Sequence, residues 1–328
     1  MSTPPTIELQ APDLRRWADG NTGTPFVWSF DSGVAGPHAM VQALTHGNEF
    51  CGAIALDRLL ADQAQWRVQR GRLTLVFGNL EAFARWDPAE PDRSRYVDED
   101  FNRVWADEAL SGPRDSVELR RARALRPFVD AADLLLDLHS MGEPCEPLMV
   151  CGTTGRGGDK GVALSRRLGV PGVLLVDTGH PSGLRMIERG DFADPAHPRT
   201  AVLIECGQHW EAAAAEVAHD TLLRFLAHAG VLAEGYLAAR LQALGRPPAP
   251  RQRLLRVTEA VVARSTGFRF VRPFRGLEVL AKAGEAIATD GELRLHAPFD
   301  DTVLVMPSVT PPKMGATMVR LGRYEDPA

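Results

Sequence analysis

The sequence predicts an α/β protein: a three-layer first domain with a mostly parallel mixed sheet flanked by helices, then a small β-rich C-terminal domain. Strand-like and helix-like segments alternate over the first two thirds of the chain, a pattern typical of layered α/β domains. Residues 132–138 form a nearly continuous apolar run, as expected of a strand buried on both faces of a parallel sheet. Beyond residue 247, short β-like runs are separated by Gly and Pro.

The individual elements follow from local hydrophobic patterns. We expect strands in the first domain at residues 25–30, 40–44, 72–77, 132–138, 148–151, 172–176 and 201–204. We expect helices at residues 50–63, 115–129, 160–168 and 211–244, the last one interrupted near Gly230. In the first of these helices the apolar stripe consists of Ile54, Leu56, Leu59 and Leu60.

Two segments carry neither pattern. Residues 84–114 are rich in Pro, Asp and Arg and are expected to form a long loop, which in a compact domain is usually functional or disordered. Residues 245–250 read Gly-Arg-Pro-Pro-Ala-Pro and give the best domain boundary. We therefore expect one domain at residues 1–247 and a β-rich domain at residues 248–328, with strands at 254–262, 276–281 and 302–306.

Composition limits the classes of function. The chain has 45% hydrophobic and 24% charged residues and a net charge of −5, which argues against a nucleic-acid-binding surface. Its four cysteines form no CxxC pair and do not indicate a disulfide framework. The N-terminus lacks a signal pattern and no apolar stretch has membrane-spanning length, so a cytoplasmic location is expected, with no membrane partner.

His46 and Glu49 lie three residues apart, between an expected strand and an expected helix. At this spacing both side chains can project to one side and bind one cation, and imidazole nitrogen and carboxylate oxygen are both zinc ligands. Of the nine histidines, only His46 is followed three residues later by Glu. The alternative is a helix-capping Glu beside a surface His.

A third metal ligand is expected from His139, which closes the apolar run 132–138. A His at a strand end is often a hydrogen-bonded core residue instead. Asp137, however, lies two residues earlier on the same face of the strand, where its carboxylate could orient a ligand imidazole. With three protein ligands, a catalytic metal keeps an open position for water.

Glu205 follows the apolar run 201–204 and is the candidate general base. Partial desolvation at the edge of the sheet would raise its pKa toward the useful range. In parallel sheets ligands bind beyond the carboxyl ends of the strands, where His46, His139 and Glu205 are all expected. A salt-bridged strand terminus is the alternative for Glu205, and the neighbouring Cys206 is a further conceivable zinc ligand.

The long loop contains the sequence Arg-Tyr-Val-Asp-Glu-Asp-Phe-Asn-Arg at residues 95–103. Arg95, Asn102 and Arg103 can serve an anion, because arginine binds carboxylates through two parallel hydrogen bonds and a cation can stabilise a tetrahedral oxyanion. The alternative is a solvated loop that pairs with its own three acidic residues.

These motifs, in this order, resemble the succinylglutamate desuccinylase/aspartoacylase family, a branch of the zinc carboxypeptidase A-like superfamily. The matching segments are THGNE at 45–49, GN at 78–79, RYVDEDFNR at 95–103, DLH at 137–139 and IECG at 204–207. The resemblance extends to about residue 210, and the β-rich tail fits the second domain of the family.

The resemblance implies a role for each matching residue. The implied ligands of one Zn²⁺ per chain are His46, Glu49 and His139. The implied catalytic residues are Glu205, as the general base that activates water, and Arg95, which would polarise the scissile carbonyl. The implied substrate-binding residues, for the α-carboxylate, are Asn102 and Arg103. Candidates for a second substrate carboxylate are Arg185, Arg189 and Arg199.

We therefore expect a zinc-dependent amidohydrolase that deacylates an N-acylated amino acid or a similar small anionic carboxylate. A zinc carboxypeptidase acting on short peptides would use the same groups with a roomier cleft. A binding protein that kept the fold and lost turnover is the alternative of another class. Which acyl group and amino acid are recognised, and whether the chain forms a homo-oligomer, are questions that the sequence leaves open.

Overall fold

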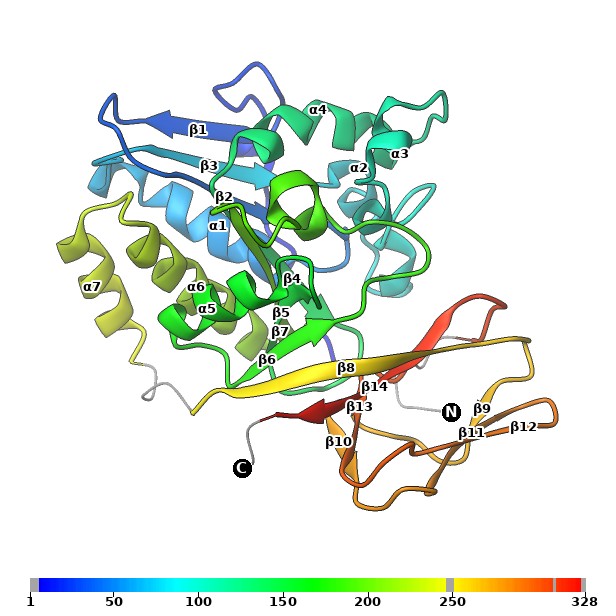
Figure 1. Cartoon of the computed structure of the whole chain (residues 1–328). Coiled ribbons are helices and arrows are strands. Elements are labelled where there is room, and N and C mark those ends of the chain that lie inside the picture. The colour runs from blue at the N-terminus through cyan, green and yellow to red at the C-terminus, as the bar shows by residue number, and fades with distance from the viewer. Residues whose placement is uncertain (1–5, 246–250, 309–310, 326–328) are drawn as a thin grey trace.

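The computed structural model describes residues 6–245, 251–308 and 311–325. A large sheet of 11 strands runs through the molecule, and a separate sheet of three strands is formed by residues from the C-terminal part of the sequence (Figure 1). In the order of the large sheet, its strands are β1 (Val27–Asp31), β3 (Arg72–Phe77), β2 (His38–Ala43), β4 (Leu134–Met141), β7 (Thr200–Gln208), β5 (Leu148–Thr153), β6 (Val173–Asp177), β8 (Arg253–Val262), β14 (Thr317–Tyr324), β13 (Thr302–Val305) and β10 (Glu278–Leu280).

The first part of this sheet is mostly parallel. Strands β3, β2, β4 and β7 pair in parallel, as do β5 with β6 and β6 with β8. Strand β1 is antiparallel to β3, and β5 is antiparallel to β7. The expected mixed, mostly parallel sheet is therefore confirmed, and the antiparallel β5 lies directly beside β7, the strand that carries Glu205.

Helices cover both faces of the sheet and complete the three layers. On one face lie α1 (Cys51–Ala61), α5 (Gly158–Leu168) and α6 (Ala212–Ala229), with α7 (Glu234–Ala243) packed on α6, and on the other lie α4 (Val117–Ala131) and α3 (Asp107–Ser111). Of the helices formed by the described residues, none has the length and apolar character needed to cross a membrane.

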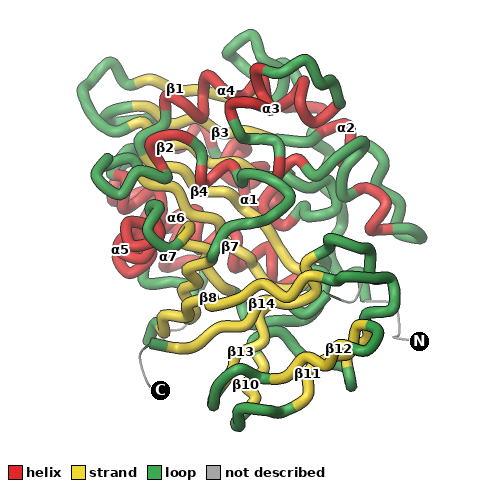
Figure 2. Tube along the Cα trace, turned by 45° about the vertical axis from the view of Figure 1, so that its right-hand side comes forward, coloured by secondary structure: helices red, strands yellow, loops and turns green. Residues whose placement is uncertain are grey.

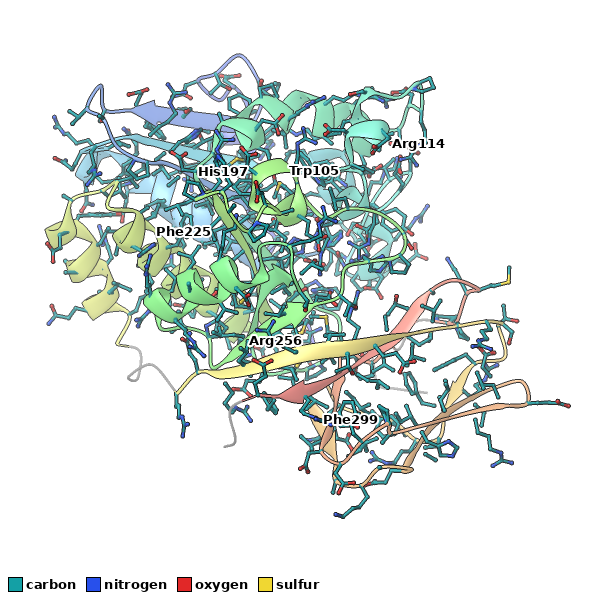
Figure 3. All side chains as sticks on the ribbon, in the orientation of Figure 1. Trp105, Arg114, His197, Phe225, Arg256 and Phe299 are labelled. Carbon is teal, nitrogen blue, oxygen red and sulfur yellow. The ribbon has the colours of Figure 1, made fainter. Side chains whose placement is uncertain are left out.

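Two hydrophobic cores lie on opposite faces of the sheet, because alternate residues of each strand point in opposite directions. Phe225 of α6 belongs to the first core and Trp105 to the second, and Figure 3 shows them on the two sides of the central strands. In β2, Val41 packs in the first core and its neighbour Met40 packs in the second. Both faces of the central strands are thus buried, as the apolar run 132–138 indicated.

The expected long loop at residues 84–114 has more structure than its composition suggested. After the short helix α2 (Leu80–Phe83), it contains the 3-10 helices η3 (Pro91–Ser94) and η4 (Phe101–Arg103), followed by α3. Phe101 and Trp105 are fully buried and pack edge to face. The burial of these two rings fixes a segment whose polar neighbours gave no helical pattern.

The C-terminal strands continue the large sheet (Figure 2). Strand β8 pairs in parallel with β6. The strands β14, β13 and β10 then follow in this order, each antiparallel to the one before it. The small antiparallel sheet consists of β12 (Leu293–His296), β11 (Ala286–Asp290) and β9 (Arg269–Phe270). A third hydrophobic core, which includes Phe268 and Ile287, is formed by residues of this β-rich region. The expected domain boundary at residues 247/248 lies outside the described residues, and the division there stays a prediction.

Candidate active site

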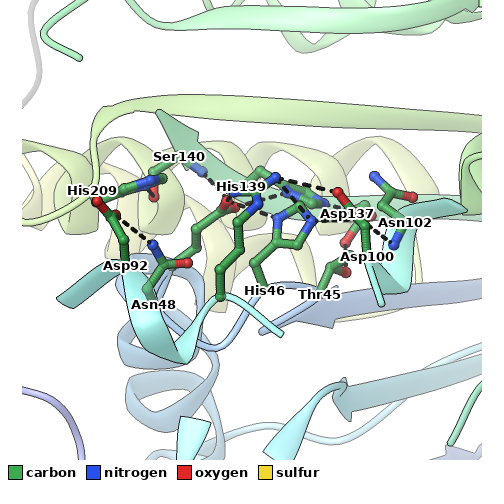
Figure 4. A network of polar contacts seen from close by, with 12 residues as sticks. Thr45, His46, Asn48, Asp92, Asp100, Asn102, Asp137, His139, Ser140 and His209 are labelled. Atoms are coloured by element: carbon green, nitrogen blue, oxygen red, sulfur yellow. Dashed lines mark hydrogen bonds and ion pairs between the residues drawn. The ribbon is translucent and has the colours of Figure 1, made fainter. Parts of the chain in front are cut away.

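A buried cluster of potential metal ligands, the metal cluster, consists of His46, Glu49 and His139. One potential ligand atom from each residue lies within 4.8 Å of the others. Nδ1 of His46 lies 2.7 Å from Oε1 of Glu49, and Nδ1 of His139 lies 2.8 Å from Oε2 of the same carboxylate. Figure 4 shows both imidazoles at the centre of the polar network. The structure therefore brings together the three residues that the sequence predicted as metal ligands.

Carboxylates hold the outer nitrogen of each imidazole. Nε2 of His46 lies 2.9 Å from Oδ1 of Asp100, and Nε2 of His139 lies 2.8 Å from Oδ2 of Asp137. Burial alone would lower the pKa of His139, but Asp137 and Glu49 raise it well above the usual range. An outer carboxylate that fixes the ring and raises its basicity is the usual second partner of a zinc-binding His. The donor set and its surroundings thus fit zinc.

The chain between β2 and α1 is shaped by Gly47. A Cβ atom at this position would lie 2.4 Å from both Phe83 N and Ser94 O. This distance is a steric clash, so the close approach of the backbone requires glycine here. The Gly47 N–H donates to the carbonyl oxygen of Arg95 at 3.1 Å. Gly47 thus lets the segment that carries His46 and Glu49 dock closely against the long loop.

Glu205 faces the metal cluster from the adjacent strand. Glu205 lies opposite His139 in the parallel register of β4 and β7. Its neighbours Ile204 and Cys206 point to the other face of the sheet, into the first hydrophobic core. Glu205 Oε2 is buried and has no hydrogen-bond partner among the described residues. Burial, aided by the charge of Glu49, raises the pKa of Glu205 to about 8.

The expectation that these residues stand at strand ends needs a correction. His139 and Glu205 lie inside their strands, since β4 continues to Met141 and β7 to Gln208. The apolar runs end before the strands do, because Ser140 and Gln208 are polar residues that are buried within the strands.

Arg95 reaches the cluster from the long loop. Its Nη1 donates to Oε1 of Glu49 at 2.9 Å, and its Nη2 lies 3.7 Å from Oδ2 of Asp100. The Arg95 side chain is 35% exposed. The guanidinium group therefore borders the metal cluster on one side and is accessible to a small molecule on the other.

Asn102 and Arg103 follow on the same loop. Asn102 is buried, and its Oδ1 accepts a hydrogen bond from Met186 N at 3.0 Å. Arg103 donates to the carbonyl oxygen of Asn102 at 2.6 Å, and no carboxylate of the described residues lies within ion-pair distance of its guanidinium group. Burial lowers the pKa of Arg103 to about 10, although Asp100 acts in the opposite direction.

The three arginines considered for a second carboxylate are all paired. The carboxylates that contact Arg185 are Asp177 at 2.8 Å and Glu188 at 2.7 Å. Those that contact Arg189 are Asp130 and Asp107, and Arg199 lies 3.3 Å from Asp191. Arg320 of β14 contacts the same carboxylate as Arg185, since its Nε lies 3.2 Å from Asp177 Oδ1. Arg103 differs from these four arginines, because no carboxylate of the described residues pairs with it.

Comparison with known proteins identifies the family of this chain. Residues 35–231 match the succinylglutamate desuccinylase/aspartoacylase catalytic domain family. The chain belongs to this family. The named members of the family are deacylating hydrolases. Among curated proteins, none matches the chain.

Several solved structures share the fold. A succinylglutamate desuccinylase from Vibrio cholerae aligns with a TM-score of 0.66 at 16% identity, over 92% of this chain and 86% of the other. A succinylglutamate desuccinylase/aspartoacylase from Rhodobacter sphaeroides aligns with a TM-score of 0.61 at 17% identity, over 92% and 89%. The product-bound ectoine utilization protein EutE (DoeB) from Ruegeria pomeroyi aligns with a TM-score of 0.60 at 19% identity, over 90% and 88%.

Two polar residues beside the site were not found by sequence reasoning. Ser140 N donates to Oε2 of Glu49 at 3.2 Å, and Ser140 Oγ lies 2.9 Å from Nδ1 of His209. Burial lowers the pKa of His209 to about 4. Their places in the sequence could have indicated them as site residues. Ser140 directly follows the motif at 137–139, and His209 comes shortly after the motif at 204–207. Cys206 is not part of the metal cluster.

Proposed function

We propose that this member of the family is a zinc-dependent amidohydrolase that removes the acyl group from an N-acylated amino acid or a similar small carboxylate. The observation that carries this proposal is the position of Glu205. Its unpartnered carboxylate oxygen shares the face and register of His139, beside a buried His–Glu–His cluster. A general base next to a three-ligand metal site is the arrangement that hydrolysis requires.

The metal would be held by His46, Glu49 and His139, a donor set that occurs in catalytic zinc sites. Zinc bound there would supply Lewis acidity and lower the pKa of a coordinated water. Asp100 and Asp137 would fix the two imidazoles, each through its Nε2 atom.

The side chains around the metal divide the remaining work. Glu205 would accept a proton from the attacking water and deliver it to the leaving amine. Burial raises its pKa in the metal-free protein, and a more basic carboxylate is the better proton acceptor. Arg95 would donate hydrogen bonds to the carbonyl oxygen as negative charge develops on it. Its position at the edge of the cluster, partly exposed, supports this role.

The substrate carboxylate would be bound by Arg103 together with Asn102. A half-buried guanidinium group without a carboxylate partner favours the binding of an anion, and Arg103 meets this description among the described residues. Solved proteins of the same fold include succinylglutamate desuccinylases and the product-bound ectoine utilization protein EutE (DoeB). These names support an N-acyl amino acid as the substrate class here.

The test is a hydrolysis screen with zinc present, in which N-acyl amino acids and dipeptides are compared. Release of free amino acid from the acyl compounds supports the proposal. Preferential cleavage of dipeptides would instead identify a carboxypeptidase, and the absence of any turnover by zinc-loaded protein would favour a binding function.

Metal analysis tests the site independently of the substrate. His46→Ala and His139→Ala should each lose most of the zinc, because one of three protein ligands is removed. Both variants should still fold, since a core of this size does not depend on one ion. Stoichiometric zinc in both variants would refute the assignment.

A further inference from the structure

Glu118 makes a set of contacts that no sequence motif indicated. It lies in the first turn of α4 and is fully buried. Its Oε1 accepts hydrogen bonds from Asn79 Nδ2 at 3.0 Å and from Val97 N at 2.7 Å. Its Oε2 accepts from the backbone N–H groups of Asp98 at 3.1 Å and Glu99 at 3.3 Å. One buried side chain therefore holds three consecutive amides of the long loop.

The loop also grips the N-terminus of α4 in return. Val117 N donates to Oδ2 of Asp98 at 2.8 Å, and Ser116 Oγ donates to Oε1 of Glu99 at 2.6 Å. Acidic groups are favourable at a helix N-terminus, where backbone N–H groups lack intrahelical partners. The contacts in both directions fix residues 97–99 against a rigid helix.

Residues 97–99 lie directly between two groups of the active site. Arg95, two residues before Val97, reaches Oε1 of Glu49. Asp100, the residue after Glu99, holds Nε2 of His46. Any shift of the three amides held by Glu118 would therefore move both a guanidinium group and a ligand-orienting carboxylate, and misplacement by about 1 Å can greatly reduce turnover.

We propose that Glu118 is a positioning residue that sets the placement of Arg95 and Asp100 at the metal cluster, with Asn79 of the 78–79 motif as its support. The catalytic part of this inference rests on the proposed function. The part that concerns Asp100 and His46 does not depend on the substrate.

The first experiment is Glu118→Gln. The glutamine amide group would face N–H donors and leave at least one of them unpaired, so the loop amides should exchange with solvent faster at residues 97–99. We expect kcat/KM to fall about 10-fold or more, mainly through kcat. In an Arg95→Ala background the same change should reduce kcat/KM by a smaller factor than in the wild type, because one of the two groups that Glu118 positions is already absent.

Asp220→Asn is the matched control. Asp220 is also a buried carboxylate, on α6, and accepts a hydrogen bond from Arg224. This variant should lower the unfolding midpoint and leave kcat/KM and the exchange of residues 97–99 unchanged. If Glu118→Gln also lowers only the midpoint, or if its effect is equally large with and without Arg95, Glu118 has a structural role alone and the proposal is refuted.

Zinc dissociation, followed with a competing chelator, separates this inference from the proposed function. Glu118→Gln should speed dissociation about 10-fold, the range typical of residues that orient a ligand, but not in an Asp100→Asn background. If the wild type hydrolyses no acyl amino acid yet shows this dependence, the proposed function fails and the positioning role stands. An equal acceleration in both backgrounds overturns the positioning role.

Discussion

Asp137 Oδ2 lies 2.8 Å from Nε2 of His139, and the two side chains project from the same face of β4. The second carboxylate oxygen of Asp137 accepts a hydrogen bond from Thr45 Oγ1 at 2.8 Å. Both oxygens are therefore occupied, and the imidazole has its Nδ1 turned toward Glu49 at 2.8 Å. This pair determines which nitrogen of His139 is available to a metal.

Asp137→Asn should weaken zinc binding about 10–100-fold, the usual effect of losing the outer partner of a ligand His. The affinity can be measured by competition with a chromogenic chelator. Asp290→Asn is a matched control, because Asp290 is a buried carboxylate on β11 in the small sheet. Unchanged zinc affinity in Asp137→Asn would show that His139 does not need this partner.

Glu205→Gln should keep the fold and the zinc and lose turnover by ~10²–10⁴-fold, the contribution of a positioned acid–base group. Steady-state kinetics with zinc-loaded protein measures the loss. Near-normal turnover would place the base elsewhere, with Glu143 and Glu188 as the next candidates. Glu188 is the weaker of the two because Arg185 holds its carboxylate.

The same residue should contribute to the pH dependence of stability in the metal-free protein. The pKa of Glu205 is raised from 4.5 to about 8 by burial and the charge of Glu49. Between these values the folded protein retains a proton that the unfolded chain has lost. The free energy of unfolding should therefore fall as pH rises through this window, by at most about 1.4 kcal/mol per pH unit from this group.

Urea unfolding in the presence of chelator, at several values from pH 5 to pH 8, tests this prediction. Glu205→Gln lacks the titrating group, so its stability should rise relative to the wild type as the pH increases. Parallel curves for the two proteins would contradict the raised pKa.

The two loop arginines should affect different kinetic constants. Arg103→Ala should act mainly on KM and cost ~2–5 kcal/mol in kcat/KM, as for one partner of a buried charge pair. Arg95→Ala should act mainly on kcat, because its partner charge develops only in the transition state. Arg294→Ala, at an exposed site on β12, should change neither.

A substrate in which the carboxylate is converted to an amide checks what Arg103 recognises. The wild type should lose about the same factor on this substrate as on removal of Arg103, and Arg103→Ala should lose little more. If the wild type hydrolyses the amide and the carboxylate equally well, anion recognition is wrong.

The family and the residues of the metal cluster could be predicted from the sequence because their signals are short-range. The spacing of His46 and Glu49 is local, and Asp137 and His139 share a face whenever their segment is a strand. The apolar runs likewise indicated the strands that became β3, β4 and β7. In each case burial imposes a pattern on neighbouring residues, and this pattern can be read without knowing the partner of a segment.

Only the tertiary structure decided which segments pair. The register of His139 with Glu205 joins strands from distant parts of the chain, and the parallel pairing of β8 with β6 extends the large sheet into the C-terminal region. Glu118 is an unremarkable helix residue in the sequence, yet in the structure it holds the loop that carries Arg95. Strand pairing and buried polar contacts depend on groups that are remote along the chain, and local patterns of hydrophobicity contain no information about which remote groups will meet.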